Sequence, residues 1–370
     1  MKVSVIGGGN GGYALAFHMS KLGHDVLLYQ HPQRRAKIDE TISTGIIVAE
    51  PKEGEYTAAL SGTATIDKAT YDIKEAIEYS DIAVFVVPAF GQISLFEQSL
   101  PYFKDDHIII NLPGNFASLE YAQIMEDRGI NKRLKLVDTS TIPYACRRLS
   151  GSRVFISGLK VGMHIGVFPG KFTDAVIDRI SPLFDLKIHK SKNVIEAALS
   201  NTNLPLHPAG VLFNTGWVEA TGGNFGFYSD GFTESVGRFS EAVDREKVML
   251  GKKIDLKLMN CVQCLKFFYG DTDDKTIHQF VSRAKHYKFF KAPPSLDNRY
   301  VTEDLAYLIV PTVRYIFKRA GIESPAMNAM IKCAEILTGK EIRPERHFTV
   351  ILKDGETVED MNRRLQFWLD

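Results

Sequence analysis

The chain has 370 residues, 45% of them hydrophobic, and its 45 Lys and Arg against 44 Asp and Glu give a formal net charge of +1. This length is typical of two domains, and the near-neutral charge gives no electrostatic reason to expect a nucleic acid or an acidic surface as a partner. The 4 cysteines are too few for a disulfide framework and fit a reducing cytoplasm, which is the expected location.

Two features of the chain argue against export or membrane insertion. The first predicted strand begins at Lys2, which leaves no room for a signal peptide. The most apolar run, IAVFVVPAF, is far too short to span a bilayer. We therefore expect no membrane partner.

The first half alternates between predicted strands and predicted helices. A β-branched strand at 2–6 leads into a glycine cluster and a helix that ends at Gly23. Fully apolar strands that alternate with helices are typical of a parallel sheet covered on both faces. The further strands are predicted at 24–30, 80–88, 106–113 and 134–141, and the further helices at 34–44, 119–129 and 171–184.

Two hairpins are expected in addition to this pattern. Residues 45–60 have the composition of a small hairpin inserted after a helix. Residues 152–169 contain two strand-like stretches around a turn, which predicts an antiparallel hairpin that closes the sheet.

From residue 191 onward the patterns are mostly helical. Long helical stretches are predicted at 234–256 and 303–321. The sequence therefore predicts an α/β protein with a Rossmann-type parallel-sheet domain at 1–190 and an all-helical domain at 191–370. We expect the active site in the cleft between these halves, at the carboxyl ends of the strands.

A glycine pattern follows the first predicted strand. Gly7, Gly9 and Gly12 form a G-x-G-x-x-G motif between a strand and a helix, the context of a dinucleotide-binding loop. In that role Gly7 permits the tight turn, Gly9 lets the backbone approach a pyrophosphate, and Gly12 lets the helix pack on the sheet. The alternative is an ordinary glycine turn.

The second predicted strand lacks the acidic residue that accepts hydrogen bonds from the ribose of NAD. Gln30 occupies that place, so a 2′-phosphate is not repelled, and Arg34 or Arg35 could pair with it. NADP is therefore favoured. NAD stays open because Gln30 can bond an unphosphorylated ribose and both arginines can be solvated helix residues.

A polar stripe crosses the apolar segment 193–217. Its members recur at helical spacings of three, four and seven, which would place them on one helix face. Two prolines interrupt the same segment, and each removes a backbone donor. A histidine on a distorted helix suits a reaction site, although a core histidine with a satisfied hydrogen bond is an equal alternative. The stripe consists of Ser200, Asn203, His207 and Asn214, and the prolines are Pro205 and Pro208.

A second candidate site is predicted where a later helix begins. Thr302 has the character of an N-cap, with Glu303 and Asp304 in the first turn and Arg299 just before the cap. The arginine and an acid could bind a carboxylate and orient a histidine. The alternative is that the acids only complement the helix dipole.

Two further motifs have simpler explanations. The CVQC run at 261–264 has no second cysteine pair and falls in a helical stretch, so buried helix cysteines are favoured over a metal or redox pair. Residues 286–294 mix bases and aromatics in one short stretch, which favours a loop or lid over nucleic-acid contact. No Ser-His-Asp order or metal-ligand cluster stands out in the sequence.

The chain resembles the octopine/opine dehydrogenase family, with matching motifs in the right order along nearly its whole length. The family has a Rossmann domain followed by a helical domain, and its members use NAD(P)H to join an amino acid reductively to a 2-oxo acid. The motifs are GGGNGGYALA at 7–16, VVPA at 86–89, NLPGN at 111–115, SNTNLPLHP at 200–208, FTESVGRFSEAVDRE at 232–246 and DNRYVTEDL at 297–305.

The resemblance implies roles for particular residues. It assigns the acid/base role to His207, the partner role to Asp304 and a substrate carboxylate to Arg299. Asn203 and Cys146 are further candidates at the substrate, the role of Cys146 being open. The expected cofactor contacts are Gly7, Gly9, Asn10, Gly12, Gln30, Arg34 and Pro88.

Two other functions remain as alternatives. A 2-oxo-acid reductase of the ketopantoate or glycerol-phosphate type has the same two-domain plan. Such reductases resemble one another in using a lysine on the inter-domain helix, whereas ALSNTNLPLHP has a histidine and no lysine. A non-catalytic NAD(P) sensor would need the glycine loop without the His207–Asp304 pair. The expected small-molecule partners are an amino acid and a 2-oxo acid. A homodimer is one form that the enzyme could take, and we expect no metal.

Overall fold

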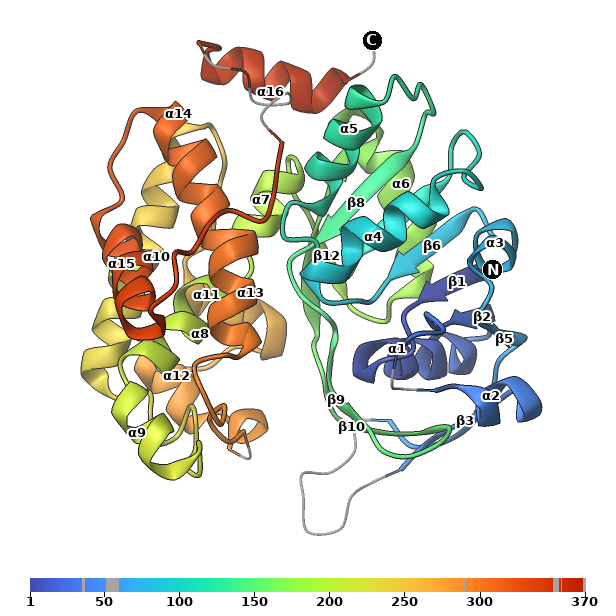
Figure 1. The fold of residues 1–370 in the computed structure, drawn as a ribbon, viewed down its shortest axis with the longest axis horizontal. Helices are drawn as coiled ribbons and strands as arrows, with labels where there is room; N and C mark the ends of the chain where they lie inside the picture. The colour runs from blue at the N-terminus through green and yellow to red at the C-terminus, as the bar shows by residue number, and fades with distance from the viewer. Residues whose placement is uncertain (35–36, 51–59, 289, 349–352, 354, 369–370) are drawn as a thin grey trace. The chain divides into compact units, whose positions relative to one another are not determined.

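The computed structural model describes residues 1–34, 37–50, 60–288, 290–348, 353 and 355–368. The chain divides into two compact units, Met1–Val194 and Ile195–Asp370, which Figure 1 shows in blue to green and in yellow-green to red. The sequence places the corresponding division at 190/191.

An eight-stranded sheet forms the first unit, in the order β12-β11-β8-β7-β6-β1-β2-β5. The run β5-β2-β1-β6-β7-β8 has the strand order of a dinucleotide-binding fold, and all of its pairs are parallel. The strands are β1 (Lys2–Ile6), β2 (Asp25–Tyr29), β5 (Lys68–Thr70), β6 (Ile82–Phe85), β7 (Ile108–Asn111), β8 (Lys135–Thr139), β11 (Gly162–Phe168) and β12 (Lys187–Lys190).

The central strands are buried along nearly their whole length because helices cover the sheet. The strand order reverses between β1 and β6, which places the ligand site of such a fold at the loops that follow these two strands. Figure 1 shows α4 and α5 side by side over the sheet. The helices of this unit are α1 (Asn10–Lys21), α2 (Asp39–Thr44), α3 (Ile73–Glu78), α4 (Ala89–Ser99), α5 (Ala117–Asp127) and α6 (Thr173–Ile180).

A four-stranded sheet in the order β4-β3-β10-β9 adds to this plan. Helix α1 contacts both β1 and β2 of the large sheet and β9 and β10 of the small one, so it connects the two. The predicted hairpin at 45–60 contains only β3 (Ile46–Ala49), because the strand that pairs antiparallel with it, β4 (Gly62–Thr65), begins beyond the predicted range; residues 51–59 lie outside the described chain. The other strands are β9 (Tyr144–Arg148) and β10 (Arg153–Leu159).

The predicted hairpin at 152–169 is wrong. Strand β10 pairs with β9 and β3 in the small sheet, and β11 pairs antiparallel with β8 in the large sheet. Both stretches are strands with the predicted apolar character. The partner β9 directly precedes β10 in the chain, whereas β3 lies far from it, and the apolar pattern of a strand does not reveal which partner it takes.

The second unit is helical, as predicted. Helix α8 is buried from Leu204 to Leu212 and contacts α10, α13 and α15, so it is the centre of this unit. A helix that is apolar all round belongs in a core, and this pattern explains why its single histidine is buried too. The main helices are α8 (Asn203–Leu212), α9 (Thr215–Thr221), α10 (Glu234–Lys253), α11 (Cys261–Tyr269), α12 (Ile277–Arg283), α13 (Arg299–Asp304), α15 (Pro325–Thr338) and α16 (Val358–Phe367).

Two segments of π-helix, Leu305–Ile309 and Thr312–Phe317, continue directly from α13. The Ala306 carbonyl in the first of them accepts a hydrogen bond from the Glu345 backbone N–H, at 2.8 Å. Within the described residues, none of the helices combines the length and apolar character that crossing a membrane requires.

Candidate active site

The glycine loop joins β1 to α1. Gly7 has a φ of +123°, and a Cβ there would lie 2.5 Å from the Val86 carbonyl oxygen. A Cβ on Gly12 would lie 1.6 Å from the Gly7 carbonyl oxygen, whereas one on Gly9 would meet nothing within 4 Å. Gly7 and Gly12 are therefore required by the protein's own backbone. Gly9, at the N-cap of α1, leaves open space where a pyrophosphate would approach the helix.

Gln30 lies directly after β2 and is buried. Its side-chain oxygen accepts hydrogen bonds from the backbone N–H groups of Gly8, at 3.1 Å, and His31, at 3.2 Å. The acceptor of this amide is thus committed to the backbone of the glycine loop and of the strand end.

The other predicted cofactor residues lie at the loops after β2 and β6. The Arg34 guanidinium lies 5.7 Å from the centroid of the Phe90 ring, in the first turn of α4, and Pro88 is the N-cap of that helix. The predicted helix at 34–44 is shorter in the structure: α2 begins at Asp39, and Arg34 precedes it. Arg35 lies outside the described residues.

A cavity of about 570 Å³ opens beside the glycine loop within the first unit. Its lining joins the start of α1 to the segment before α2 and to the turn between β9 and β10. It mixes two cations with two carboxylates. The lining residues are Gly9, Asn10, Lys37, Asp39, Glu40, Arg148, Leu149 and Gly151.

In the second unit, His207 and Asp304 form a buried pair. The imidazole Nδ1 lies 2.7 Å from a carboxylate oxygen of Asp304, although the residues are 97 positions apart, and they are 6% and 4% exposed. A carboxylate can only accept, so in the neutral imidazole this bond places the proton on Nδ1 and leaves Nε2 as the acceptor.

Two tyrosines contact His207. The Tyr228 hydroxyl lies 3.1 Å from Nε2, and the Tyr300 ring stacks on the imidazole with centroids 3.8 Å apart. Burial raises the pKa of Tyr228 well above its usual value, so this phenol stays protonated and donates to Nε2.

The sequence analysis missed both tyrosines. Tyr300 lies four positions before Asp304 on α13, a spacing that places them on one helix face, so it could have been found. Tyr228 precedes the long α10 in an irregular segment, and no periodicity connects it to the helix of His207.

The predicted N-cap at Thr302 is wrong. Asn298 caps α13, its side-chain oxygen accepting from the Tyr300 N–H at 3.2 Å, and Thr302 lies inside the helix with its hydroxyl on the Asn298 carbonyl. Arg299 is consequently the first residue of α13. Asp304 lies in the second turn of a helical run that continues without a break into the π-helical segments.

Arg299 is exposed, and its guanidinium lies 6.0 Å from the Tyr300 ring centroid. The same tyrosine stacks on His207, so one ring contacts the imidazole and lies close to the guanidinium. The structure thereby brings Arg299 into the neighbourhood of the His207–Asp304 pair.

The predicted polar stripe is divided among separate helices. Ser200 lies before α8 and Asn214 is the N-cap of α9. Their side chains donate to backbone carbonyls, Ser200 to Glu196 and Asn214 to Gly210 and Gly231. These two residues therefore hold helix ends rather than a common polar face.

Asn203 and His207 remain together on α8. Asn203 is its first residue, four positions before the histidine. Pro205 lies in the first turn, where its missing N–H costs no helical hydrogen bond, so only Pro208 interrupts the helix.

Cys146 belongs to β9, in the first unit. Shielding from water raises the pKa of its thiol to about 12, which keeps the sulfur neutral. Cys261 and Cys264, of the CVQC motif, are buried in α11, which confirms their interpretation as core helix cysteines.

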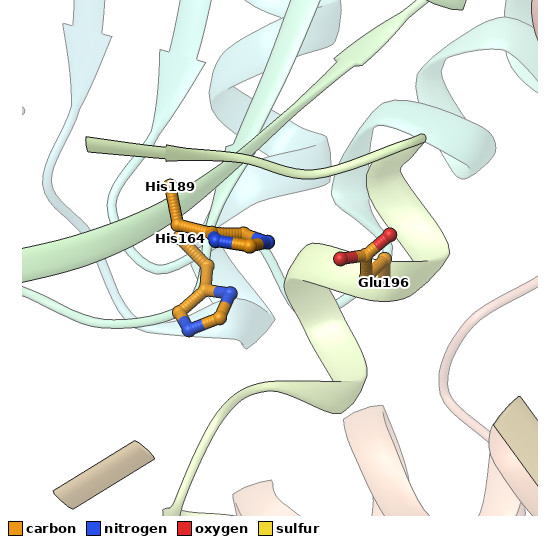
Figure 2. A group of neighbouring side chains, drawn as sticks. All are labelled: His164, His189 and Glu196. Carbon is orange, nitrogen blue, oxygen red and sulfur yellow. The ribbon is translucent and has the colours of Figure 1, made fainter. Parts of the chain in front are cut away.

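Two histidines outside these sites lie on adjacent strands. His164 of β11 pairs in register with His189 of β12, and the ring centroids are 4.4 Å apart. Figure 2 shows the two rings, and it also labels Glu196, in the first turn of α7 (Val194–Leu199).

Comparisons with known proteins agree with both units. The model of the NAD/NADP octopine/nopaline dehydrogenase α-helical domain matches residues 190–338, and that of the NAD-dependent glycerol-3-phosphate dehydrogenase N-terminus matches 2–126. An opine dehydrogenase of Arthrobacter sp. (strain 1C) is 28% identical, covering 97% of this chain and 94% of its own. The octopine dehydrogenase of Pecten maximus is 26% identical, covering 92% and 91%.

Solved structures show the same fold. The structure of octopine dehydrogenase with NADH and L-arginine has a TM-score of 0.72 at 20% identity and covers 99% of this chain and 96% of its own. Yersinopine dehydrogenase with NADP⁺ has a TM-score of 0.64 at 13% identity and covers 99% and 97%. With a nucleotide-binding unit, a matching helical domain and relatives along its full length, the chain resembles the octopine/opine dehydrogenase family, whose members are NAD(P)-dependent oxidoreductases acting on CH–NH bonds.

Proposed function

We propose that this protein joins an amino acid to a 2-oxo acid through an imine, using NAD(P)H, with His207 as the acid/base and Asp304 as its partner. The observation that carries the proposal is the buried 2.7 Å bond between His207 Nδ1 and the Asp304 carboxylate. A histidine oriented by a carboxylate is a recurrent arrangement for moving protons near neutral pH.

The glycine loop fits the expected cofactor, because a Cβ on Gly9 would fill space that the protein itself leaves open. When bound, the nicotinamide cofactor supplies the hydride that reduces the imine carbon. Condensation of the amine with the 2-oxo group releases water and needs proton transfers at oxygen and nitrogen. His207 supplies and removes these protons at Nε2, and Asp304 holds the ring and favours its protonated form.

Tyr228 belongs to this proposed mechanism. Its hydroxyl donates to His207 Nε2, the atom that would face the substrate. The phenol therefore satisfies the lone pair of the base until a substrate group takes that position.

For the cofactor we propose a preference for NADP. Gln30 lies directly after β2 in place of an acidic residue, and its side-chain oxygen accepts from the N–H groups of Gly8 and His31. A neutral amide at this position does not repel a 2′-phosphate. Arg34, in the loop before α2, would add a positive charge.

The variant Gln30→Glu tests this preference at constant shape. It keeps an oxygen for the two backbone N–H groups and adds a negative charge, so repulsion of a 2′-phosphate should lower kcat/KM for NADPH relative to NADH by about tenfold or more. Gln33→Glu, in the exposed loop after β2, is the control for added charge. An unchanged ratio of the two cofactors in initial-rate assays would contradict a role for Gln30 in the choice.

The variant Arg299→Lys tests the proposed carboxylate contact. Because a lysine cannot form two parallel hydrogen bonds, KM for one carboxylate substrate should rise by roughly ten- to a hundredfold, with a smaller change in kcat. Arg238→Lys, at an exposed position of α10, is the matched control. If KM for both substrates stays as in the wild type, Arg299 does not bind either carboxylate.

A substrate panel tests the reaction itself. The solved relatives include octopine dehydrogenase complexes with L-arginine, agmatine and pyruvate, so pyruvate with L-arginine is the first mixture to try. Oxidation of NADPH or NADH that needs both an amino acid and a 2-oxo acid supports the proposal. Oxidation with the oxo acid alone would identify a reductase, and binding without turnover would identify a sensor.

A further inference from the structure

We propose that Arg148, on β9 of the small sheet, is a positioning residue of the cofactor site that holds the glycine loop in its binding conformation. The inference concerns a residue outside the glycine motif, 140 positions from Gly8. It does not depend on which substrates the enzyme joins.

The Arg148 side chain connects four segments of the first unit. One terminal nitrogen donates to the Gly8 carbonyl at 2.9 Å, and the other donates to the Tyr13 hydroxyl at 3.0 Å and to the Gly151 carbonyl at 2.8 Å. It also donates to the Lys37 carbonyl. One guanidinium thus binds four segments: the glycine loop, α1, the segment before α2 and the β9–β10 turn.

Two more contacts tie Arg148 to the start of α1. The guanidinium carbon lies 4.0 Å from the centroid of the Tyr13 ring, a cation–π distance. The Arg148 backbone N–H donates to the Asn10 side-chain oxygen at 2.8 Å. Because Gly8 and Asn10 flank Gly9, β9 holds the chain on both sides of the open position where a pyrophosphate would bind.

This arrangement has a consequence for affinity. A glycine-rich loop is the backbone with the most conformational freedom to lose, and a ligand that must order it binds more weakly. By fixing the Gly8 carbonyl, Arg148 fixes the plane of the peptide that carries the Gly9 N–H. It also lines the cavity beside Gly9, where its charge favours an anion over a neutral ligand.

The test compares Arg148→Met with Arg147→Met in the full-length protein, by titrating NADPH and NADH against intrinsic fluorescence. Arg147 is the adjacent residue, exposed on β9, and it carries the same charge. We expect Arg148→Met to raise Kd by about tenfold or more for both cofactors alike, and Arg147→Met to leave both near wild type. An equal loss of affinity for NADPH and NADH distinguishes this role from that of Gln30, whose replacement is expected to change only the preference between the two cofactors.

Two readouts separate positioning from general stability. At saturating NADPH, kcat of Arg148→Met should approach the wild-type value while KM for NADPH rises, and Arg148→Lys should recover only part of the affinity, since an ammonium cannot reach the same acceptors. A variant that has lost stability alone would show a lower Tm, but its Kd, measured at a temperature well below that Tm, would be unchanged.

The inference is overturned if Arg148→Met binds both cofactors as Arg147→Met does. If Gly9→Ala lost cofactor binding in the same assay, the cofactor would be shown to bind at the glycine loop without needing Arg148. If neither Arg148 variant folds, Tyr13→Phe removes one acceptor of the guanidinium, and we expect a rise in Kd of about two- to fivefold. An unchanged Kd in Tyr13→Phe would then count against the proposal.

Discussion

Replacing His207 by alanine is expected to lower kcat by about 10²–10⁴-fold, the usual contribution of a placed acid/base. The reason is the loss of Nε2, which the bond from Nδ1 to Asp304 leaves as the only ring nitrogen able to face a substrate. Binding of NADPH should be unchanged, because the glycine loop belongs to the other unit. Single-turnover rates and cofactor titrations of the same preparations check both statements.

The pair should behave as one unit. Asp304→Asn keeps the shape but removes the charge, so we expect a smaller loss than for His207→Ala. The double variant should be little worse than His207→Ala alone, since residues that act together are not additive. His278→Ala, on α12 with its ring bonded to the Phe232 carbonyl, is the control for losing a structural histidine. Fully additive losses would break the proposed pair, and a nearly wild-type His207→Ala enzyme would refute the mechanism.

The second large effect separates two glycines of the loop. Gly12→Ala places a Cβ 1.6 Å from the Gly7 carbonyl, a backbone atom that cannot move aside without displacing the turn, so stability should fall by about 1–3 kcal/mol or more. Gly9→Ala meets nothing within 4 Å and should keep the wild-type Tm. Its added methyl group would occupy space for the pyrophosphate, so NADPH affinity should fall by roughly ten- to a hundredfold.

Thermal unfolding and NADPH titration on the same two variants give the comparison. The expected pattern is reciprocal: Gly12→Ala loses Tm, and Gly9→Ala loses affinity at constant Tm. A Gly9→Ala protein that binds NADPH normally would mean that the cofactor does not approach the backbone at this position.

Much of this protein followed from local patterns in the sequence. The glycine motif lies within a few residues, between a strand and a helix. The spacing of Gly7, Gly9 and Gly12 was therefore enough to predict the steric role of each. The apolar strands around them predicted the parallel sheet, since strands buried on both faces need helices on both sides. His207 stood out as a histidine on the polar stripe of the mostly apolar segment 193–217, which two prolines interrupt.

The tertiary structure decided which distant residues meet. No local rule pairs β10 with β3, brings Arg148 to Gly8, or places Tyr228 on His207, because each contact joins segments separated by loops whose path depends on the packed core. The N-cap of α13 could not be chosen from residue type alone. Asparagine and threonine both favour the N-cap position, and the structure uses Asn298 and not Thr302. Propensity and periodicity act over a few residues, and they selected the elements. Packing acts across the whole chain, and it alone brought their side chains into contact.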